Sequence, residues 1–119
     1  MNVLNVVKAF RAIIKDFIIE LLEREGNRRR LKARLIFIDG STLRVKDYHF
    51  GDQRKYAYHW TNVKGELIIR WDNAPHWSWI STFPHHKHVR FVENVQPSLE
   101  MSLVEVLTVI EGKILASQR

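Results

Sequence analysis

The sequence contains no cysteine among its 119 residues. Disulfide bonds, thiol nucleophiles and cysteine-ligated zinc sites are therefore excluded. Proline and glycine are also scarce, at three and five residues, and no repeat, linker or low-complexity segment marks a domain boundary. We therefore predict a single domain over residues 1–119, which is long enough to bury a core without a disulfide or a structural metal.

Long apolar runs are missing as well. The apolar stretch near the amino terminus is interrupted by Lys8, Arg11, Lys15 and Asp16. This pattern argues against a transmembrane span, and no signal-peptide cleavage pattern follows it. The sequence therefore predicts a cytoplasmic protein with no membrane partner.

Acidic residues are too few to balance the basic ones. The 19 Lys and Arg residues against 13 Asp and Glu residues give a formal net charge of +6. A positive excess favours a polyanionic partner, with nucleic acid as the first candidate. The alternative is a solvated basic surface that has no specific partner.

Apolar periodicity predicts a helix near each end of the chain. Residues 3–24 carry apolar side chains at three- and four-residue steps and end at Gly26-Asn27, which is typical of an amphipathic helix that covers a core. Ser102 and Glu105 have the spacing of a capping box, which predicts the start of a C-terminal helix.

Period-two alternation between these helices predicts antiparallel strands. A three-residue loop, 39–41, would pair Leu35 with Val45 in the first hairpin. This register keeps the apolar residues on one face, because directly opposed residues share a face. The other face would carry a basic set.

A second hairpin is predicted from residues 55–61 and 66–72. Its register would oppose Trp60 to Leu67 and gather the aromatic residues on one face. A short strand over 87–92 would follow. We therefore predict an α+β fold with an N-terminal helix, a four- to five-stranded antiparallel sheet and a C-terminal helix, both helices packing on the aromatic sheet face.

The polar chemistry is concentrated between Arg70 and His88, a stretch that holds four of the six histidines. Its prolines and tryptophans favour a shaped loop. Histidine can act as an acid or a base near neutral pH, and cationic side chains can stabilise negative charge on phosphorus. The candidates for metal-free catalysis on a phosphodiester are His59, Arg70, Asp72, His76, His86 and His88.

A metal site is an alternative interpretation of the same stretch. His86 and His88 are separated by one residue, so on an extended strand they point the same way. With Asp72 or His76 they could share a divalent ion. Because histidines are more often solvated or hydrogen-bonded structural groups, no cofactor is assigned from the sequence.

A third interpretation requires no catalysis. Basic residues could hold phosphates while exposed indoles stack on bases. If both hairpins join one sheet, the face opposite the aromatic one would be basic. The expected nucleic-acid-binding residues are Arg34, Arg44, Lys46, Lys55, Lys87, Trp77 and Trp79.

Three motifs resemble the TumE-type toxins of bacterial and archaeal toxin–antitoxin systems. They are Tyr58-His59-Trp60, then Arg70-Trp71-Asp72-Asn73-Ala74-Pro75-His76, then Thr82-Phe83-Pro84-His85-His86-Lys87-His88. The resemblance runs from the first hairpin to the last helix. The chain departs from it at Trp77, where family members often have a second histidine. The resemblance implies a toxin encoded beside a DNA-binding antitoxin that neutralises it.

The function expected from these observations is the toxin of a type II toxin–antitoxin system that acts on RNA. An endoribonuclease is one form of this hypothesis, and whether the protein is an enzyme stays open. The alternatives are a non-catalytic nucleic-acid-binding or regulatory module and a His/Asp metal-dependent hydrolase. The expected partners are the cognate antitoxin and RNA, and a homodimer is left open.

Overall fold

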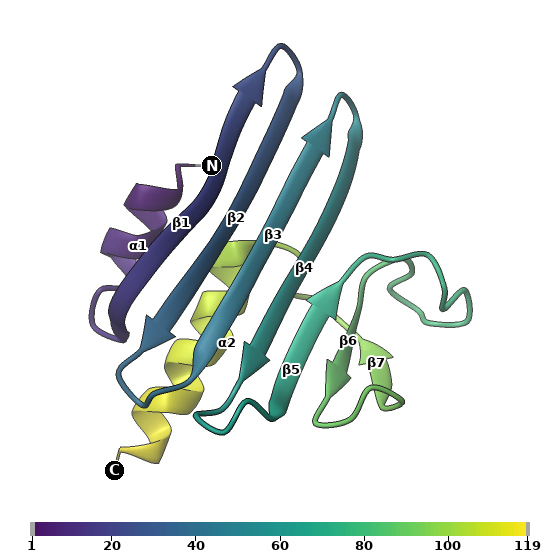
Figure 1. The fold of residues 1–119 in the computed structure, drawn as a ribbon. Helices are drawn as coiled ribbons and strands as arrows, with labels where there is room; N and C mark the ends of the chain where they lie inside the picture. Colours follow the sequence, from purple (N-terminus) through teal and green to yellow (C-terminus); the bar gives the residue numbers. More distant parts are fainter. Residues whose placement is uncertain (1, 119) are drawn as a thin grey trace.

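Seven strands follow one another in chain order in one antiparallel sheet, and two helices lie behind it in the view of Figure 1. The computed structural model describes residues 2–118, and within them it has an α+β fold. The elements are α1 (Val3–Ala9), β1 (Ile14–Glu25), β2 (Arg28–Phe37), β3 (Thr42–Phe50), β4 (Gln53–Thr61), β5 (Leu67–Asp72), β6 (His86–Val89), β7 (Val95–Pro97) and α2 (Leu103–Ser117).

The helix predicted over residues 3–24 is wrong beyond Ala9, because most of that stretch forms the edge strand β1. Two β-bulges in β1 explain the misleading pattern. Each bulge adds a residue to one strand and shifts which side chains face the core. Ile14, Phe17, Ile19 and Leu22 oppose the buried Phe37, Leu35, Ala33 and Leu31 of β2. The steps of three residues between Ile14 and Phe17 and between Ile19 and Leu22 resemble helical spacing.

The hairpin of β2 and β3 has its apolar residues on one face, as predicted, but the predicted pairing is wrong. Leu35 pairs with Leu43 and not with Val45. The loop closes one residue earlier than predicted, because the Phe37 N–H donates to the Ser41 carbonyl at 2.9 Å. A shift of two residues keeps every side chain on the same face of the sheet. The predicted apolar and basic faces are therefore correct although the predicted register is wrong.

The hairpin of β4 and β5 shows the same kind of shift. Trp60 pairs with Ile69 and not with Leu67. The Asn62 side chain organises the intervening turn, where its Oδ1 accepts hydrogen bonds from the N–H groups of Lys64 and Glu66 at 2.9 and 3.0 Å. A bulge at Trp60/Thr61 accompanies this turn. Neither feature is visible in the apolar alternation.

The prediction of four to five strands is also wrong, because β6 and β7 extend the sheet to seven. β6 (His86–Val89) overlaps the strand predicted over 87–92, but it begins one residue earlier and ends at Val89. β7 has only three residues and ends in Pro97, so it offers no alternation to detect. These two strands bring the histidine-rich segment into the sheet.

One buried cluster joins both helices to the inner face of the sheet. The aromatic face of β4 and β5 lies in this core, as Tyr58 and Trp71 are fully buried. α2 begins after Ser102, whose Oγ accepts a hydrogen bond from the Glu105 N–H at 3.2 Å, which confirms the predicted cap. Within residues 2–118, no helix is long and apolar enough to cross a membrane. In the described part of the chain, no helix covers the outer face of the sheet (Figure 1).

Candidate functional site

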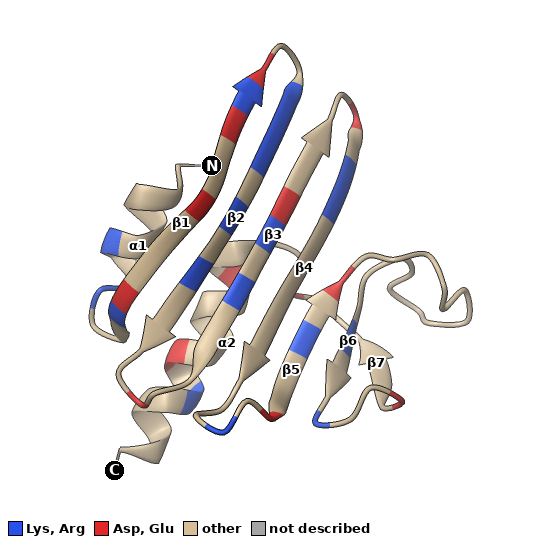
Figure 2. Cartoon of the chain, viewed as in Figure 1, with Lys and Arg blue, Asp and Glu red and all other residues tan. Residues whose placement is uncertain are grey.

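Several Lys and Arg residues lie along the neighbouring strands β2 and β3 (Figure 2), and alternation along the paired strands places some of them on the outer face. Arg34 lies opposite Arg44 across β2 and β3, and Lys32 lies opposite Lys46. Like charges in directly opposed positions are unfavourable by themselves. Glu20 of β1 offsets part of this charge through its ion pair with Arg34 at 3.5 Å, and the remaining positive excess suits an anionic ligand. A shallow groove of about 660 Å³ follows the face. Its lining includes Lys32, Arg44, Lys46, Ala57, His59 and Arg70.

A second groove, of about 570 Å³, lies beside the start of α1 and is lined by Leu4, Leu22 and Leu31 among others. Its lining also includes Arg24, Arg29, Arg30 and His49, whereas the groove on the outer face contains His59 and Arg70, and Arg70 bonds the buried Asp72. The chemistry therefore favours the groove on the outer face.

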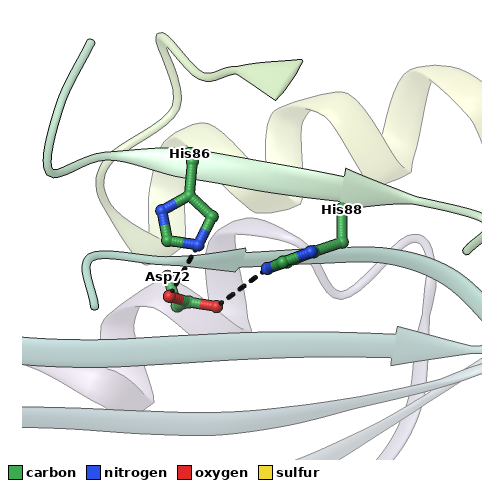
Figure 3. Close-up of side chains that lie close together, drawn as sticks. All are labelled: Asp72, His86 and His88. Carbon is green, nitrogen blue, oxygen red and sulfur yellow. Dashed lines mark ion pairs between the residues drawn. The ribbon is translucent and has the colours of Figure 1, made fainter. Parts of the chain in front are cut away.

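Asp72, His86 and His88 converge beside this groove, where β5 pairs with β6 (Figure 3). Asp72 lies directly opposite His86, so their side chains share the outer face of the sheet. His86 Nε2 lies 2.9 Å from Asp72 Oδ1, and His88 Nε2 lies 3.6 Å from Asp72 Oδ2. Asp72 Oδ1 also accepts a hydrogen bond from the Ala74 N–H at 3.0 Å. All three side chains are buried.

Backbone carbonyls fix the orientation of both imidazoles. His86 Nδ1 lies 2.9 Å from the Pro84 carbonyl oxygen, and His88 Nδ1 lies 2.7 Å from that of Val92. A carbonyl oxygen can only accept, so Nδ1 is the donor in each ring. In the neutral rings, Nε2 is then an acceptor, and it faces the carboxylate of Asp72.

The segment after β5 explains why two histidines on an outer face are buried. The ring centroid of Trp77 lies 6.1 Å from that of His86 and 6.0 Å from that of His88, in edge-to-face contacts. Asn73 anchors the start of this segment, since its Oδ1 accepts from the Tyr56 N–H at 3.0 Å and its Nδ2 donates to the Arg54 carbonyl at 2.8 Å. Trp77 is therefore a cover for the cluster.

Arg70 connects the buried cluster to the open groove. Its Nε donates to Asp72 Oδ2 at 3.1 Å, and its Nη1 lies 3.3 Å from Nδ1 of His59. A guanidinium has no acceptor, so His59 Nδ1 accepts this bond and the neutral ring carries its hydrogen on Nε2. Burial, followed by the charges of Arg70 and Arg44 and the nearby His88, lowers the pKa of His59 below its ordinary value of 6.5. His59 is therefore a neutral imidazole at pH 7.

The structure does not bring every sequence candidate to this place. His76 is exposed, and its N–H is hydrogen-bonded to the Ala74 carbonyl. Lys87 alternates to the other side of β6, where its Nζ pairs with Glu100 at 3.2 Å, so it does not line the groove. Lys55 lies exposed on β4, and Trp79 is 71% exposed.

Lys32 was missed by the sequence interpretation, although it lines the groove opposite Lys46. Its signal was present, because alternation through the basic run 28–34 places Lys32 on the same face as Arg34. The carbonyls of Pro84 and Val92 gave no signal, since main-chain acceptors are independent of residue type. Only the fold shows that they orient His86 and His88.

Comparison with known proteins gives a match to a family model described as toxin TumE, over residues 3–114. The matched range contains every strand of the sheet, the basic groove and the Asp72–His86–His88 cluster. No curated protein and no solved structure was found to match the chain.

Proposed function

The chain belongs to the TumE toxin family, and from this premise we propose that it is the toxin of a type II toxin–antitoxin system that cleaves RNA. Membership of a toxin family implies a cognate antitoxin as its partner. RNA as the substrate, and cleavage as the reaction, rest on the charge of the groove and on the chemistry beside it.

The observation that carries this proposal is the position of Arg70. Its guanidinium lies between a neutral histidine in an open basic groove and a carboxylate in a buried cluster. Arginine binds phosphate through several N–H donors of fixed geometry. A phosphodiester held by Arg70 would therefore lie next to His59.

The reaction that fits this arrangement is attack of a ribose 2′-hydroxyl on the adjacent phosphorus. When phosphate replaces His59 as a partner of Arg70, Nδ1 of His59 becomes free to accept the 2′-hydroxyl proton. The bond from the 2′-oxygen to phosphorus forms, the bond to the 5′-oxygen breaks, and the leaving oxygen takes a proton from water. Arg70, Arg44 and Lys46 stabilise the charge that develops on the phosphoryl oxygens.

The groove also suggests how the antitoxin acts. A partner that covers the outer face would block phosphate binding without any change in the fold. We propose that this partner carries a DNA-binding domain and that the pair acts in the cytoplasm, where RNA and the translation machinery are found. A homodimer stays a prediction, which the mass of the purified protein in solution would decide.

A purified-protein assay tests the proposal. The wild-type chain is expected to generate new RNA ends and to inhibit growth on expression. His59→Gln is expected to lose about 100-fold or more in cleavage rate while it still binds RNA. His76→Gln is the matched control, because His76 is exposed and outside the groove, and its activity should be unchanged.

The second candidate function is RNA binding without catalysis, which the basic groove would support alone. It predicts tight, salt-sensitive binding and no cleavage product from the wild-type chain. An absence of product, or full cleavage by His59→Gln, would refute the catalytic proposal. Cleavage that depends on His59 would exclude the purely binding function.

A further inference from the structure

We propose that Asp72, His86 and His88 bind one divalent transition-metal ion of the zinc class. Both Nε2 atoms and the carboxylate oxygens of Asp72 point into the same small space (Figure 3). The three residues offer one ligand atom each within 4.8 Å of one another. Two imidazoles and a carboxylate form a donor set that suits zinc and related ions.

One buried nitrogen of the cluster, Nε2 of His86, is unsatisfied within the described residues. His86 is 1% exposed, and its Nε2 has no hydrogen-bond partner among residues 2–118, although it lies 2.9 Å from Asp72 Oδ1. Because Nδ1 holds the ring hydrogen toward Pro84, two acceptors face each other at hydrogen-bonding distance. A buried arrangement of this kind requires a positive species between the two atoms.

Hydrogen bonds with surrounding groups hold the three side chains in place. Histidines that bind metal through Nε2 usually donate Nδ1–H to a carbonyl or carboxylate, which fixes the tautomer. His86 and His88 both do so, toward Pro84 and Val92. The carboxylate is supported as well, since Asp72 accepts hydrogen bonds from Arg70 and from the Ala74 N–H.

The spacing of the ligand atoms is also close to that of a tetrahedral metal site. Metal–ligand bonds of about 2.0–2.1 Å in a tetrahedral site separate neighbouring ligand atoms by roughly 3.3 Å. The two histidine–aspartate separations of 2.9 and 3.6 Å fall on either side of this value. Three protein ligands leave one position for water or substrate, as in catalytic zinc sites.

Protons instead of a metal would satisfy the cluster less well. A single hydrogen on Nε2 of His86 would give that ring a donor toward Asp72, but Nε2 of His88 would still face the same carboxylate without one. One ion shared by both rings satisfies the two Nε2 atoms at once.

The role that we give the ion in catalysis rests on the proposed function. The proposal that the cluster binds an ion does not depend on it. With a divalent ion and Arg70 against one carboxylate, the cluster carries excess positive charge that suits an anion. An ion at this place would add to the electrostatic stabilisation of a phosphoryl group held by Arg70. The substrate group expected next to the ion is therefore a phosphodiester, bound between the basic groove and the Asp72–His86–His88 cluster.

Metal binding to the full-length chain is the direct test. Protein stripped with a chelator is titrated with Zn²⁺ by calorimetry and with Co²⁺ by absorption spectroscopy. We expect one ion per chain and the intense visible bands of a tetrahedral cobalt site. Asp72→Asn and His88→Gln should each bind at least about 10-fold more weakly. His85→Gln is the matched control, since this neighbour bonds Tyr56 and not Asp72, and it should bind as the wild type does.

Circular dichroism and thermal unfolding of each metal-free variant show whether its fold is retained. If either ligand variant fails to fold, the wild-type and His85→Gln titrations decide. The proposal is overturned if folded wild-type protein takes up no stoichiometric ion, or if His85→Gln loses binding while Asp72→Asn keeps it. Stoichiometric metal binding without RNA cleavage would refute the proposed function and support the metal site. Protein that cleaves RNA but binds no metal ion would support the proposed function and refute the metal site.

Discussion

Arg70 and His59 lie directly opposite each other on β5 and β4, and the guanidinium nitrogen Nη1 is 3.3 Å from the imidazole Nδ1. This contact couples the cation that we assign to phosphate to the group that we assign to proton transfer. The coupling is electrostatic as well as geometric, because Arg70 is one of the charges that lower the pKa of His59.

Removal of Arg70 should therefore raise the pKa of His59. In Arg70→Gln, the His59 ring loses a nearby positive charge, whereas its burial, the larger cause of the lowered pKa, remains. We expect an upward shift that stops short of a fully solvated histidine. Proton NMR titration of the His59 resonance measures it, with Arg90→Gln as the control, since Arg90 is exposed and outside the groove. An unchanged or lower pKa would contradict the coupling.

RNA binding should depend on where positive charge is removed and not on how much. Arg44→Gln with Lys46→Gln takes two charges from the groove, and Lys8→Gln with Lys113→Gln takes two from exposed positions on the helices. Only the groove pair should weaken binding and reduce the salt slope, by about 0.7 for each phosphate of a single strand that is no longer neutralised. Fluorescence anisotropy at several salt concentrations measures both. Equal effects of the two pairs would show that net charge alone controls binding.

Asp47 should be critical for stability and not for chemistry. It is 4% exposed and accepts from Arg54 at 3.0 and 3.1 Å and from the Tyr58 hydroxyl at 2.6 Å. Burial and the Asp47 charge raise the pKa of Tyr58 well above its ordinary value, so its hydroxyl stays a donor. Arg54 also donates to the Met101 carbonyl, just before α2.

Asp47→Ala removes the acceptor of the buried Tyr58 hydroxyl and of the partly exposed Arg54, and we expect a loss of about 1–3 kcal/mol in the free energy of unfolding. Urea denaturation measures this loss. Glu23→Ala, which breaks the more exposed pair with Arg30, is the control and should show no measurable change. Similar curves for the two variants would refute a structural role for the Asp47 cluster.

Glu100 should make stability fall in acid. Burial alone would raise the pKa of Glu100, but hydrogen bonds from Trp71 and Lys87 and the charge of Lys87 lower it below the ordinary value of 4.5. A lowered folded-state pKa contributes stability above the unfolded value, and this contribution is lost as the pH falls through the folded value. Glu100→Gln should be less stable than the wild type at pH 7, and the difference should shrink as the pH falls below 4.5. A constant difference between thermal unfolding curves across this range would contradict the linkage.

The success of the sequence interpretation was uneven for physical reasons. Side-chain facing has a period of two in a strand, so the aromatic core face and the basic outer face followed from alternation alone. Register was wrong in both hairpins because it depends on turn hydrogen bonds, such as those of Asn62, that apolar patterns do not encode. The β1 bulges removed the alternation that would have marked a strand.

The candidate site shows the same division. The one-residue spacing of His86 and His88 predicted that they share a face, and the fold bears this out. Their convergence on Asp72 depends on the pairing of β5 with β6, a contact between segments that are far apart in the chain. The sequence suggested that Trp77 stacks on bases. Its contacts with His86 and His88 depend on the tertiary fold and could not be predicted from the sequence.

Trp77 and Trp79 should therefore respond differently to removal. Trp77→Ala uncovers His86 and His88, so their modification by diethyl pyrocarbonate should become faster. Trp79 is 71% exposed, and Trp79→Ala should leave that modification rate unchanged while it weakens RNA binding by about 1–3 kcal/mol if a base stacks on it. Mass spectrometry of the modified peptides and anisotropy with a short RNA measure the two effects. The Trp77 indole is in edge contact with both rings. If the modification rate of His86 and His88 is unchanged in Trp77→Ala, Trp77 does not protect them.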